Sequence, residues 1–305
     1  MKNRIKYKIK LIKEIVIKQD DYKIIQKMNK FNKILFYLKR VFQNLKKLID
    51  IFVFRKLYVY YVEMVLTTVC TLNCMGCSAL MDYYSKKSHI NLNENINALQ
   101  NMIKVCDIIE HLRLLGGEPL CYPKLYEILE YLNNQVKVKK VTIVTNGTLL
   151  IKDNRILEIL KNEKFNVYIS DYGLISRKKN ELINQLKNNN IKYIVPDEDR
   201  MWRDYGNLEC RNRSEKELCN QFINCRIMCN SILNGKLHHC PRSSHGTNLK
   251  KIPLREIDYI DLLDNNLTKK QLYNFFFKYV SYIETCNYCN AGTNDLKQIP
   301  PGKQL

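Results

Sequence analysis

Three cysteines stand close together in the stretch Cys70-Thr71-Leu72-Asn73-Cys74-Met75-Gly76-Cys77. This C-x3-C-x2-C spacing puts three thiolates on one short loop, where each can bind one iron of a cubane [4Fe–4S] cluster. The fourth iron is then left without a protein ligand, and an open coordination position is what separates a reactive metal site from a structural one. A structural zinc would need a fourth ligand, and no further Cys or His follows before His89. The spacing therefore favours a reactive iron–sulfur site over zinc.

Composition limits the class of protein and its compartment. The 305 residues are 46% hydrophobic and carry a formal net charge of +20, so the chain can build a core and wholesale disorder is excluded. The sequence has no apolar run long enough to span a bilayer and no secretory signal at residues 1–13, so we expect a cytosolic protein. Because reducing compartments keep thiols free, 12 clustered cysteines there favour metal binding.

Alternating strands and helices are expected to position the cysteine loop. Strands are predicted at 60–66, 111–115, 140–144, 166–170 and 191–195, and helices at 93–110, 123–132, 151–160 and 176–187. The crossovers are long enough for parallel pairing. This rhythm predicts an α/β fold, either a doubly wound sheet or a complete or partial (β/α) barrel.

Short polar or glycine-rich turns follow the predicted strands. Gly116-Gly117-Glu118-Pro119 follows the second strand, Thr145-Asn146-Gly147-Thr148 the third and Ser170-Asp171-Tyr172 the fourth. The cysteine loop follows the first. Enzymes built on parallel strands place their sites at these carboxyl ends, so we expect the four segments to form one site.

In the kind and order of these motifs, residues 60–200 resemble the radical S-adenosylmethionine (radical SAM) superfamily. The resemblance implies a partial (β/α)6 TIM-like barrel whose [4Fe–4S] cluster binds SAM through its open iron. One electron, from a reductant such as flavodoxin or ferredoxin, would then cleave SAM to methionine and a 5′-deoxyadenosyl radical that abstracts hydrogen from a substrate. It implies cluster ligands at Cys70, Cys74 and Cys77, and SAM contacts from Gly116, Gly117, Glu118, Pro119, Thr145, Asn146 and Ser170.

One position departs from the family pattern. The family usually carries an aromatic residue just before the third cysteine, where it helps to hold the adenine, and here that residue is Gly76. Tyr83 or Tyr84 downstream is a candidate substitute, and ordinary packing is the alternative role for both tyrosines.

A second cysteine pattern follows Pro196. Asn234-Gly235 between two apolar runs predicts a hairpin. The C-x9-G-x4-C spacing from Cys225 to Cys240, followed by a distant C-x2-C pair, resembles the SPASM and Twitch auxiliary domains. The resemblance implies an auxiliary [4Fe–4S] cluster, and the one-cluster Twitch form fits better because no cysteine follows the last pair. The implied ligands are Cys225, Cys240, Cys286 and Cys289, with Cys229 as an alternative to Cys225 and a structural zinc as the alternative metal.

Residues 1–56 carry 17 Lys and Arg against 4 Asp and Glu, a net charge of +13. Apolar residues recur at three- and four-residue steps from Ile34 to Phe52, which predicts an amphipathic helix. We expect this helix to pack on the main domain. The alternatives are that it lies on the anionic inner face of the membrane or binds a partner protein. Nucleic acid is the least favoured partner.

The sequence thus predicts a helical extension at 1–56, a radical SAM core at 57–199 and an auxiliary iron–sulfur domain at 200–305. We expect an oxidoreductase or maturase. The substrate is a sugar of cell-surface carbohydrate metabolism or, alternatively, a peptide. A non-catalytic iron–sulfur or zinc protein, acting as a sensor or electron carrier, is the alternative from another class, and the glycine-rich turns argue against it because an electron carrier needs no SAM pocket.

Overall fold

The computed structural model describes residues 2–16, 28–196, 201–225, 229–294 and 296–305. Part of the predicted extension, residues 17–27, lies outside these ranges.

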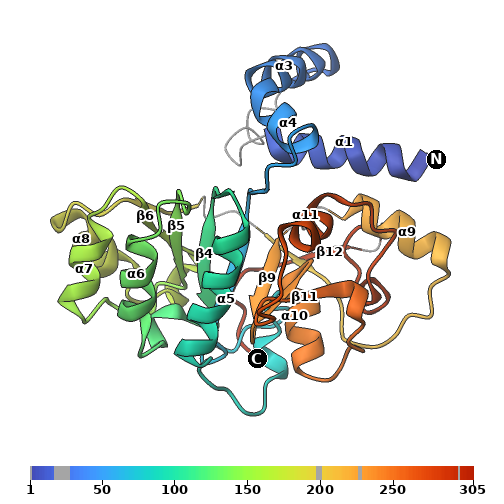
Figure 1. Cartoon of the computed structure of the whole chain (residues 1–305). Helices are drawn as coiled ribbons and strands as arrows, with labels where there is room; N and C mark the ends of the chain where they lie inside the picture. Colours follow the sequence, from blue (N-terminus) through green and yellow to red (C-terminus); the bar gives the residue numbers. More distant parts are fainter. Residues whose placement is uncertain (1, 17–27, 197–200, 226–228, 295) are drawn as a thin grey trace.

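Eight strands form one sheet in the order β11-β10-β9-β2-β4-β5-β6-β7 (Figure 1). The six strands from β9 to β7 are parallel to one another, whereas β10 pairs antiparallel with both of its neighbours, β9 and β11. Within the described ranges β7 and β11 are the two edges of this sheet, so it is open and forms no closed barrel. The expected α/β fold with a parallel sheet is confirmed. The strands are β2 (Val62–Thr67), β4 (Leu112–Gly116), β5 (Val141–Thr145), β6 (Phe165–Ile169), β7 (Tyr193–Ile194), β9 (Asn230–Leu233), β10 (Lys236–His238) and β11 (Tyr259–Asp261).

Helices connect the parallel strands, as the alternation predicted. They are α5 (Leu92–Val105), α6 (Leu125–Asn133), α7 (Asn154–Leu160) and α8 (Lys179–Asn188). Helix α5 ends five residues before the predicted end at 110, because β3 (Ile108–Ile109) pairs in parallel with β1 (Tyr58–Val59). Short 3-10 turns lie at Met81–Tyr83, Pro119–Cys121, Gly173–Ile175, Glu256–Asp258 and Glu284–Tyr288.

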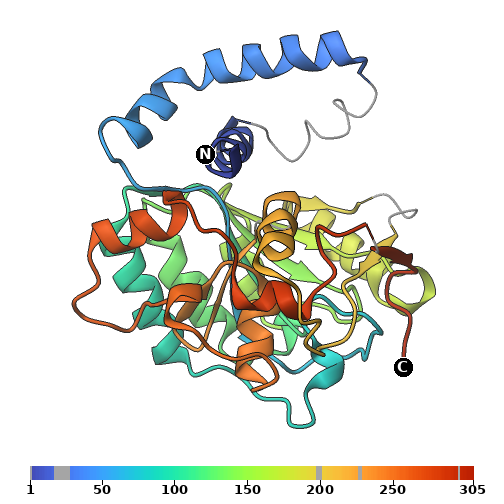
Figure 2. The same ribbon diagram turned by 90° about the vertical axis from the view of Figure 1, so that its right-hand side faces the viewer.

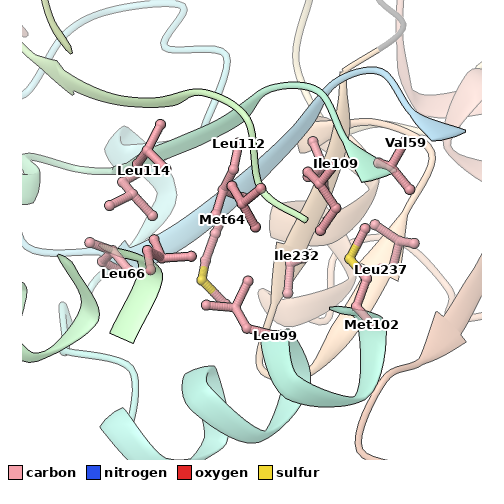
Figure 3. Packing of buried hydrophobic residues seen from close by; sticks show 14 of the residues in the cluster. Val59, Met64, Leu66, Leu99, Met102, Ile109, Leu112, Leu114, Ile232 and Leu237 are labelled. Atoms are coloured by element: carbon pink, nitrogen blue, oxygen red, sulfur yellow. The ribbon is translucent and has the colours of Figure 1, made fainter. Parts of the chain in front are cut away.

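The core lies between the sheet and these helices. Met64 of β2 and Leu114 of β4 pack toward Leu99 of α5, and Ile232 of β9 lies in the same layer (Figure 3). Side chains alternate between the two faces of a strand. The neighbouring register positions of the other face are therefore polar: Glu63, Arg113, Thr142 and Asn166.

The cysteine-bearing half shares the sheet of the core. The predicted hairpin is present as β9 and β10, and both Asn234 and Gly235 have positive φ. Because β9 pairs directly with β2, the sheet continues across the boundary that the sequence predicted at residues 199 and 200. The other elements of this half are β8 (Trp202–Asp204), α9 (Glu215–Asn224), α10 (Pro241–Asn248), α11 (Lys269–Phe277) and β12 (Lys297–Ile299), which pairs with β8.

Three helices precede the sheet: α1 (Lys2–Val16), α3 (Lys30–Gln43) and α4 (Leu45–Phe52). Helix α1 lies between α3 and the body of the molecule (Figure 2), and it buries Tyr7, Leu11, Ile15 and Val16 in the core. Helix α3 has no buried residue. The two helices therefore relate to the body in different ways. No helix of the described chain is long and apolar enough to cross a membrane.

Candidate active site

The cysteine loop leaves the carboxyl end of β2 and is held there by the turn after β4. The backbone N–H of Gly117 donates to the carbonyl oxygen of Thr67 at 2.8 Å, and the N–H of Glu118 donates to the carbonyl of Val69 at 2.9 Å. The first two predicted site segments therefore lie side by side. This contact fixes the backbone immediately before Cys70.

Glycine is required at this contact. A Cβ atom on Gly117 would lie 2.3 Å from the carbonyl oxygen of Val69 and 2.8 Å from the Cβ of Cys70, and one on Gly116 would lie 2.2 Å from the carbonyl oxygen of Thr67. Real Cβ atoms do not approach backbone this closely, so any side chain would displace the loop. The two glycines thus have a structural role in seating the cysteine loop.

Glu118 is fully buried, and its carboxylate binds the backbone of two turns. One oxygen accepts a hydrogen bond from the N–H of Leu120 at 3.0 Å, and the other accepts from the N–H of Asn146 at 2.8 Å. Burial raises the pKa of Glu118 to about 7, while the two backbone donors and Thr145 act in the opposite direction. The side chain therefore holds the turn after β4 against the turn after β5. Its expected contact with the SAM amine stays a prediction.

Asn146 carries the third predicted segment to the cysteine loop. Its side-chain nitrogen donates to the hydroxyl oxygen of Thr71 at 3.0 Å and approaches the sulfur of Cys70 at 3.7 Å. The backbone N–H of Ser170 donates to the carbonyl of Thr145 at 2.8 Å, which brings in the fourth segment. The four segments predicted to form one site therefore meet at the carboxyl ends of β2, β4, β5 and β6.

The three thiols of the loop lie in a poorly solvated environment. Burial raises the pKa of Cys70 to about 12 and that of Cys77 to about 11, and it also raises the pKa of Cys74. A buried thiolate needs a compensating positive charge, which the irons of a cluster supply. In the described ranges no three His, Cys, Asp or Glu side chains converge on a single ion. A cubane cluster uses one thiolate per iron, so its ligands need no common point. The donor set and the glycine contact fit a [4Fe–4S] cluster.

Tyr172 was predicted only as a member of the turn after the fourth strand, with no role of its own. Burial raises the pKa of its phenol, and the charges of Cys77, Cys74 and Cys70 act in the same direction, so the ring lies beside all three thiols. The ring of Trp202 meets it edge-on at 5.3 Å. The available signal was its place two residues after Ser170 in a turn that follows a strand.

The candidate substitutes for the missing aromatic residue lie in different surroundings. The hydroxyl of Tyr84 contacts Nδ1 of His245 at 2.9 Å, and Tyr83 is 37% exposed. Gly76 itself is closed off by another residue, since a Cβ there would lie 2.4 Å from the terminal methyl carbon of Ile299. The space beside the third cysteine is thus filled from a distant part of the chain.

The second cysteine group also assembles. Loss of solvation raises the pKa of the Cys240 thiol well above its usual value, and the charges of Cys289, Cys225 and Cys286 act in the same direction. The Cys240 sulfur accepts a hydrogen bond of 3.4 Å from the backbone N–H of Ser243, which lies in the first turn of α10. This hydrogen bond acts to lower the pKa of Cys240. The four thiols of the predicted auxiliary set are therefore neighbours.

Basic and glycine residues support this second group. Nη1 of Arg213 donates to the carbonyl oxygens of Cys286 at 2.9 Å and of Cys289 at 2.6 Å. A Cβ on Gly292 would lie 2.7 Å from the backbone nitrogen of Cys225, so this glycine allows the last segment to approach α9 closely. The guanidinium supplies positive charge where thiolate ligands would concentrate negative charge.

Cys229, the alternative first ligand, has different main neighbours. Burial raises its pKa strongly, and the next causes are the charges of Glu63 and Arg113 and a hydrogen bond with Tyr61. Nη1 of Arg113 donates to the Tyr61 hydroxyl at 2.6 Å, and that hydroxyl donates to Glu63 at 2.6 Å. Cys229 therefore faces a buried polar cluster at the start of β2, and Cys240 is a weaker neighbour.

A loop of three cysteines at the carboxyl end of β2, held by a glycine-rich turn, is the arrangement that an iron–sulfur protein with a small-molecule site needs. Residues 64–170 match the family described as the Radical SAM superfamily. Over that segment, about a third of the chain, the sequence is similar to the radical SAM superfamily, whose members use a [4Fe–4S] cluster and SAM.

Curated relatives match only part of the chain. A GTP 3′,8-cyclase of Actinobacillus pleuropneumoniae serotype 3 is 31% identical over 112 residues, which are 36% of this chain and 32% of the relative. A second, from serotype 5b, is 32% identical over the same length. The match thus spans about a third of these relatives.

Among solved structures, BtrN in complex with AdoMet and 2-DOIA is similar with a TM-score of 0.49 and 14% identity, covering 76% of this chain and 93% of that chain. The AdoMet-bound anSMEcpe has a TM-score of 0.48 and 12% identity, with 78% and 91% covered. SuiB of Streptococcus suis, bound to S-adenosylmethionine, has a TM-score of 0.38 and 17% identity, with 52% and 39% covered.

Proposed function

We propose that this protein is a radical SAM enzyme that reductively cleaves SAM and abstracts hydrogen from a substrate. The observation that carries the proposal is the meeting of four segments at one sheet edge: the Cys70–Cys77 loop, the Gly116–Pro119 turn, the Thr145–Thr148 turn and Ser170. An electron carrier needs the thiols but has no use for the last three segments.

The residues of the chain divide the work at this site. Cys70, Cys74 and Cys77 would hold the cluster, which supplies the electron that splits SAM. Gly116 and Gly117 keep the backbone of the turn against the backbone that leads into the cysteine loop. Glu118 and Asn146 fix the two turns relative to each other. Burial of this framework excludes water from a site where a carbon radical would otherwise be quenched.

We further propose an auxiliary [4Fe–4S] cluster of the Twitch type on Cys225, Cys240, Cys286 and Cys289. The charge coupling among these thiols and the contacts of Arg213 support it. Such a cluster would accept an electron, bind substrate or stabilise the fold. Cys229 is the less favoured ligand because its main neighbours are Tyr61, Glu63 and Arg113.

The substrate is proposed as a sugar of cell-surface carbohydrate metabolism, with a peptide as the alternative. The electron donor would be a flavodoxin or ferredoxin. One experiment separates the enzyme from a sensor, carrier or zinc protein. The protein is reconstituted anaerobically with iron and sulfide, reduced with dithionite and mixed with SAM. Formation of 5′-deoxyadenosine, absent in the Cys70/Cys74/Cys77→Ala variant, supports the proposal, whereas its absence from the iron-loaded wild type overturns it.

For location we propose a cytosolic protein that contacts the anionic inner face of a membrane through α3 and α4. These helices present a continuous apolar face to solvent: Phe31 is 73% exposed, Leu38 61% and Phe42 78%. A shallow groove of about 700 Å³ lies on this face, lined by Leu35, Leu38, Lys39, Val41, Phe42 and Leu45.

Charge favours lipid over a second copy of the chain as the occupant. Residues 30–56 carry 8 Lys and Arg and 1 Asp, and this aspartate, Asp50, already pairs with Lys56 at 3.0 Å. Each basic residue near an anionic surface contributes about 1 kcal/mol. A symmetric dimer through the same face would instead bring two strongly basic segments together. Exposed phenylalanines flanked by lysines are what an interfacial helix needs.

A further inference from the structure

The segment 297–305 crosses the cysteine loop as a strap. The backbone N–H of Met75 donates to the carbonyl of Lys303 at 2.7 Å, and the N–H of Leu305 donates to the carbonyl of Asn73 at 2.9 Å. The backbone N–H of Asn73 also donates to the side-chain oxygen of Gln304 at 2.8 Å. Three hydrogen bonds therefore join the strap to the part of the loop that surrounds Cys74.

The strap is anchored on both sides of this crossing. Its first residues form β12, in which Ile299 pairs with Trp202 of β8. Gly302 lies flat on Tyr172, since a Cβ at Gly302 would be 2.7 Å from the Cβ and Cγ atoms of that tyrosine. Tyr172 lies beside the three thiols, and the strap contacts both Tyr172 and the cysteine loop.

One contact of the strap reaches a proposed cluster ligand directly. The side-chain nitrogen of Gln304 donates to the sulfur of Cys74 at 3.2 Å, while the oxygen of the same amide holds Asn73. The side-chain amide of Gln304 thus binds the loop through both its nitrogen and its oxygen. Because the amide is planar, the hydrogen bond from Asn73 to the oxygen also orients the N–H toward Cys74. A hydrogen bond to a ligand sulfur stabilises negative charge on that sulfur.

We propose that the strap 297–305 is a wall of the cluster site and that Gln304 is a positioning residue that sets the reduction potential of the cluster through the Cys74 sulfur. The proposal rests on the triplet cluster proposed above. Reduction adds negative charge to a cluster and its sulfurs, and a hydrogen bond to a ligand sulfur stabilises that charge. Gln304 therefore makes the cluster easier to reduce.

The same strap accounts for the departure at Gly76. The position where the family carries an aromatic side chain has φ +68 here, and the space in front of it holds Ile299. A side chain at 76 would need this left-handed backbone conformation, which is strained for any residue but glycine, and would have to displace the end of the Ile299 side chain. The strap therefore supplies from residue 299 the apolar surface that the loop itself lacks.

The test compares Gln304→Met with Gln298→Met, the same substitution at an exposed glutamine of the strap that has no contact with the loop. Each protein is reconstituted anaerobically and titrated with reductant, and the reduced-cluster EPR signal that changes on adding SAM is followed. We expect a lower midpoint potential for Gln304→Met and no shift for Gln298→Met. Equal potentials in wild type and Gln304→Met would overturn the proposal.

A second variant is needed because Gln304→Met also removes the hydrogen bond from Asn73 to the side chain of Gln304. Gln304→Glu keeps an oxygen for the Asn73 N–H but has no donor for Cys74 at pH 8, so it should also lower the potential even if Gln304→Met fails to hold iron. An unshifted Gln304→Glu counts against the proposal. A wild type without a SAM-responsive signal would instead remove the proposed function itself, so the two failures are distinguishable.

Discussion

The carboxylate of Glu118 and the backbone N–H of Asn146 are joined by a 2.8 Å hydrogen bond that ties the turn after β4 to the turn after β5. Both turns contact the cysteine loop, Asn146 through Thr71 and Glu118 through its own N–H to Val69. Glu118 is therefore the point at which three of the four site segments are connected.

This connection predicts a pH dependence of stability in the apo protein. The pKa of Glu118 is raised from 4.5 to about 7, so the folded state holds a proton that the unfolded state has lost between these values. Stability should therefore fall as pH rises through this window, by about 3 kcal/mol at full ionisation, and change no further above it. Urea unfolding of wild type and Glu118→Gln at pH 5 and pH 8 measures the difference, and a gap between the two proteins that is independent of pH would contradict the prediction.

Cys74→Ala should abolish 5′-deoxyadenosine formation while the protein stays folded and keeps its auxiliary metal. The triplet has no spare ligand on its loop, and the four thiols of the second group lie elsewhere. Circular dichroism, iron analysis and the SAM-cleavage assay together check this. Retained SAM cleavage in the variant would show that the triplet is not the site.

Anaerobic reconstitution should give about eight irons per chain, four for each of two cubane clusters. The Cys70/Cys74/Cys77→Ala variant should keep about four. Elemental analysis decides the outcome: zinc in the second site would make that site structural, and about twelve irons would require a further cluster that uses Cys210, Cys219 or Cys229.

Gly117→Ala should lower iron binding at the triplet, because the new Cβ would lie 2.3 Å from the Val69 carbonyl and displace the loop. Gly173→Ala is a control for backbone strain without a steric clash: its φ is positive, which strains any side chain, but its Cβ would meet nothing within 4 Å. The control should retain full iron. If both variants load iron equally, the close approach of the two turns is not what seats the loop.

Phe42→Glu should reduce sedimentation with vesicles containing anionic lipid, whereas Val136→Glu should not. The two side chains are similarly exposed, 78% and 81%, but only Phe42 belongs to the α3 face. Binding should weaken with added salt, since the Debye length is about 8 Å at physiological ionic strength. Equal sedimentation of both variants, or none of the wild type at low salt, would reject the membrane proposal. Point variants suit this test better than removal of residues 1–56, because α1 is part of the core.

Local sequence patterns predicted the elements of the sheet well. Runs such as Val141–Thr145 and Phe165–Ile169 are β-branched or aromatic and end at turns, so β2, β4, β5, β6 and β7 were predicted within two residues, whereas β11 was not predicted. The site segments could be predicted for the same reason, since the carboxyl ends of parallel strands share one edge. The Asn234-Gly235 hairpin followed from residues that tolerate positive φ.

Contacts between segments that are far apart in the sequence could not be predicted from local sequence patterns. Nothing in Asn230–Leu233 indicates that it pairs with β2, because its apolar residues would suit any buried strand. The strap was missed for a related reason: two of its four hydrogen bonds to the cysteine loop are between backbone groups, which any sequence can make, and the other two come from the single side chain of Gln304. The face of α3 was predicted as amphipathic, but only the structure separates it from α1, which is equally basic and yet packed on the core.

The pairing of β9 with β2 constrains how the protein is made. Until residues 230–233 leave the ribosome, β2 has a free edge, and an unpaired strand edge is a template for aggregation. The loop around Cys74 is completed later still, by Lys303 and Gln304. Iron–sulfur assembly factors would therefore meet a finished triplet site only after residues 303 and 304 had been synthesised, so the nascent chain has to be kept soluble with its thiols reduced until then.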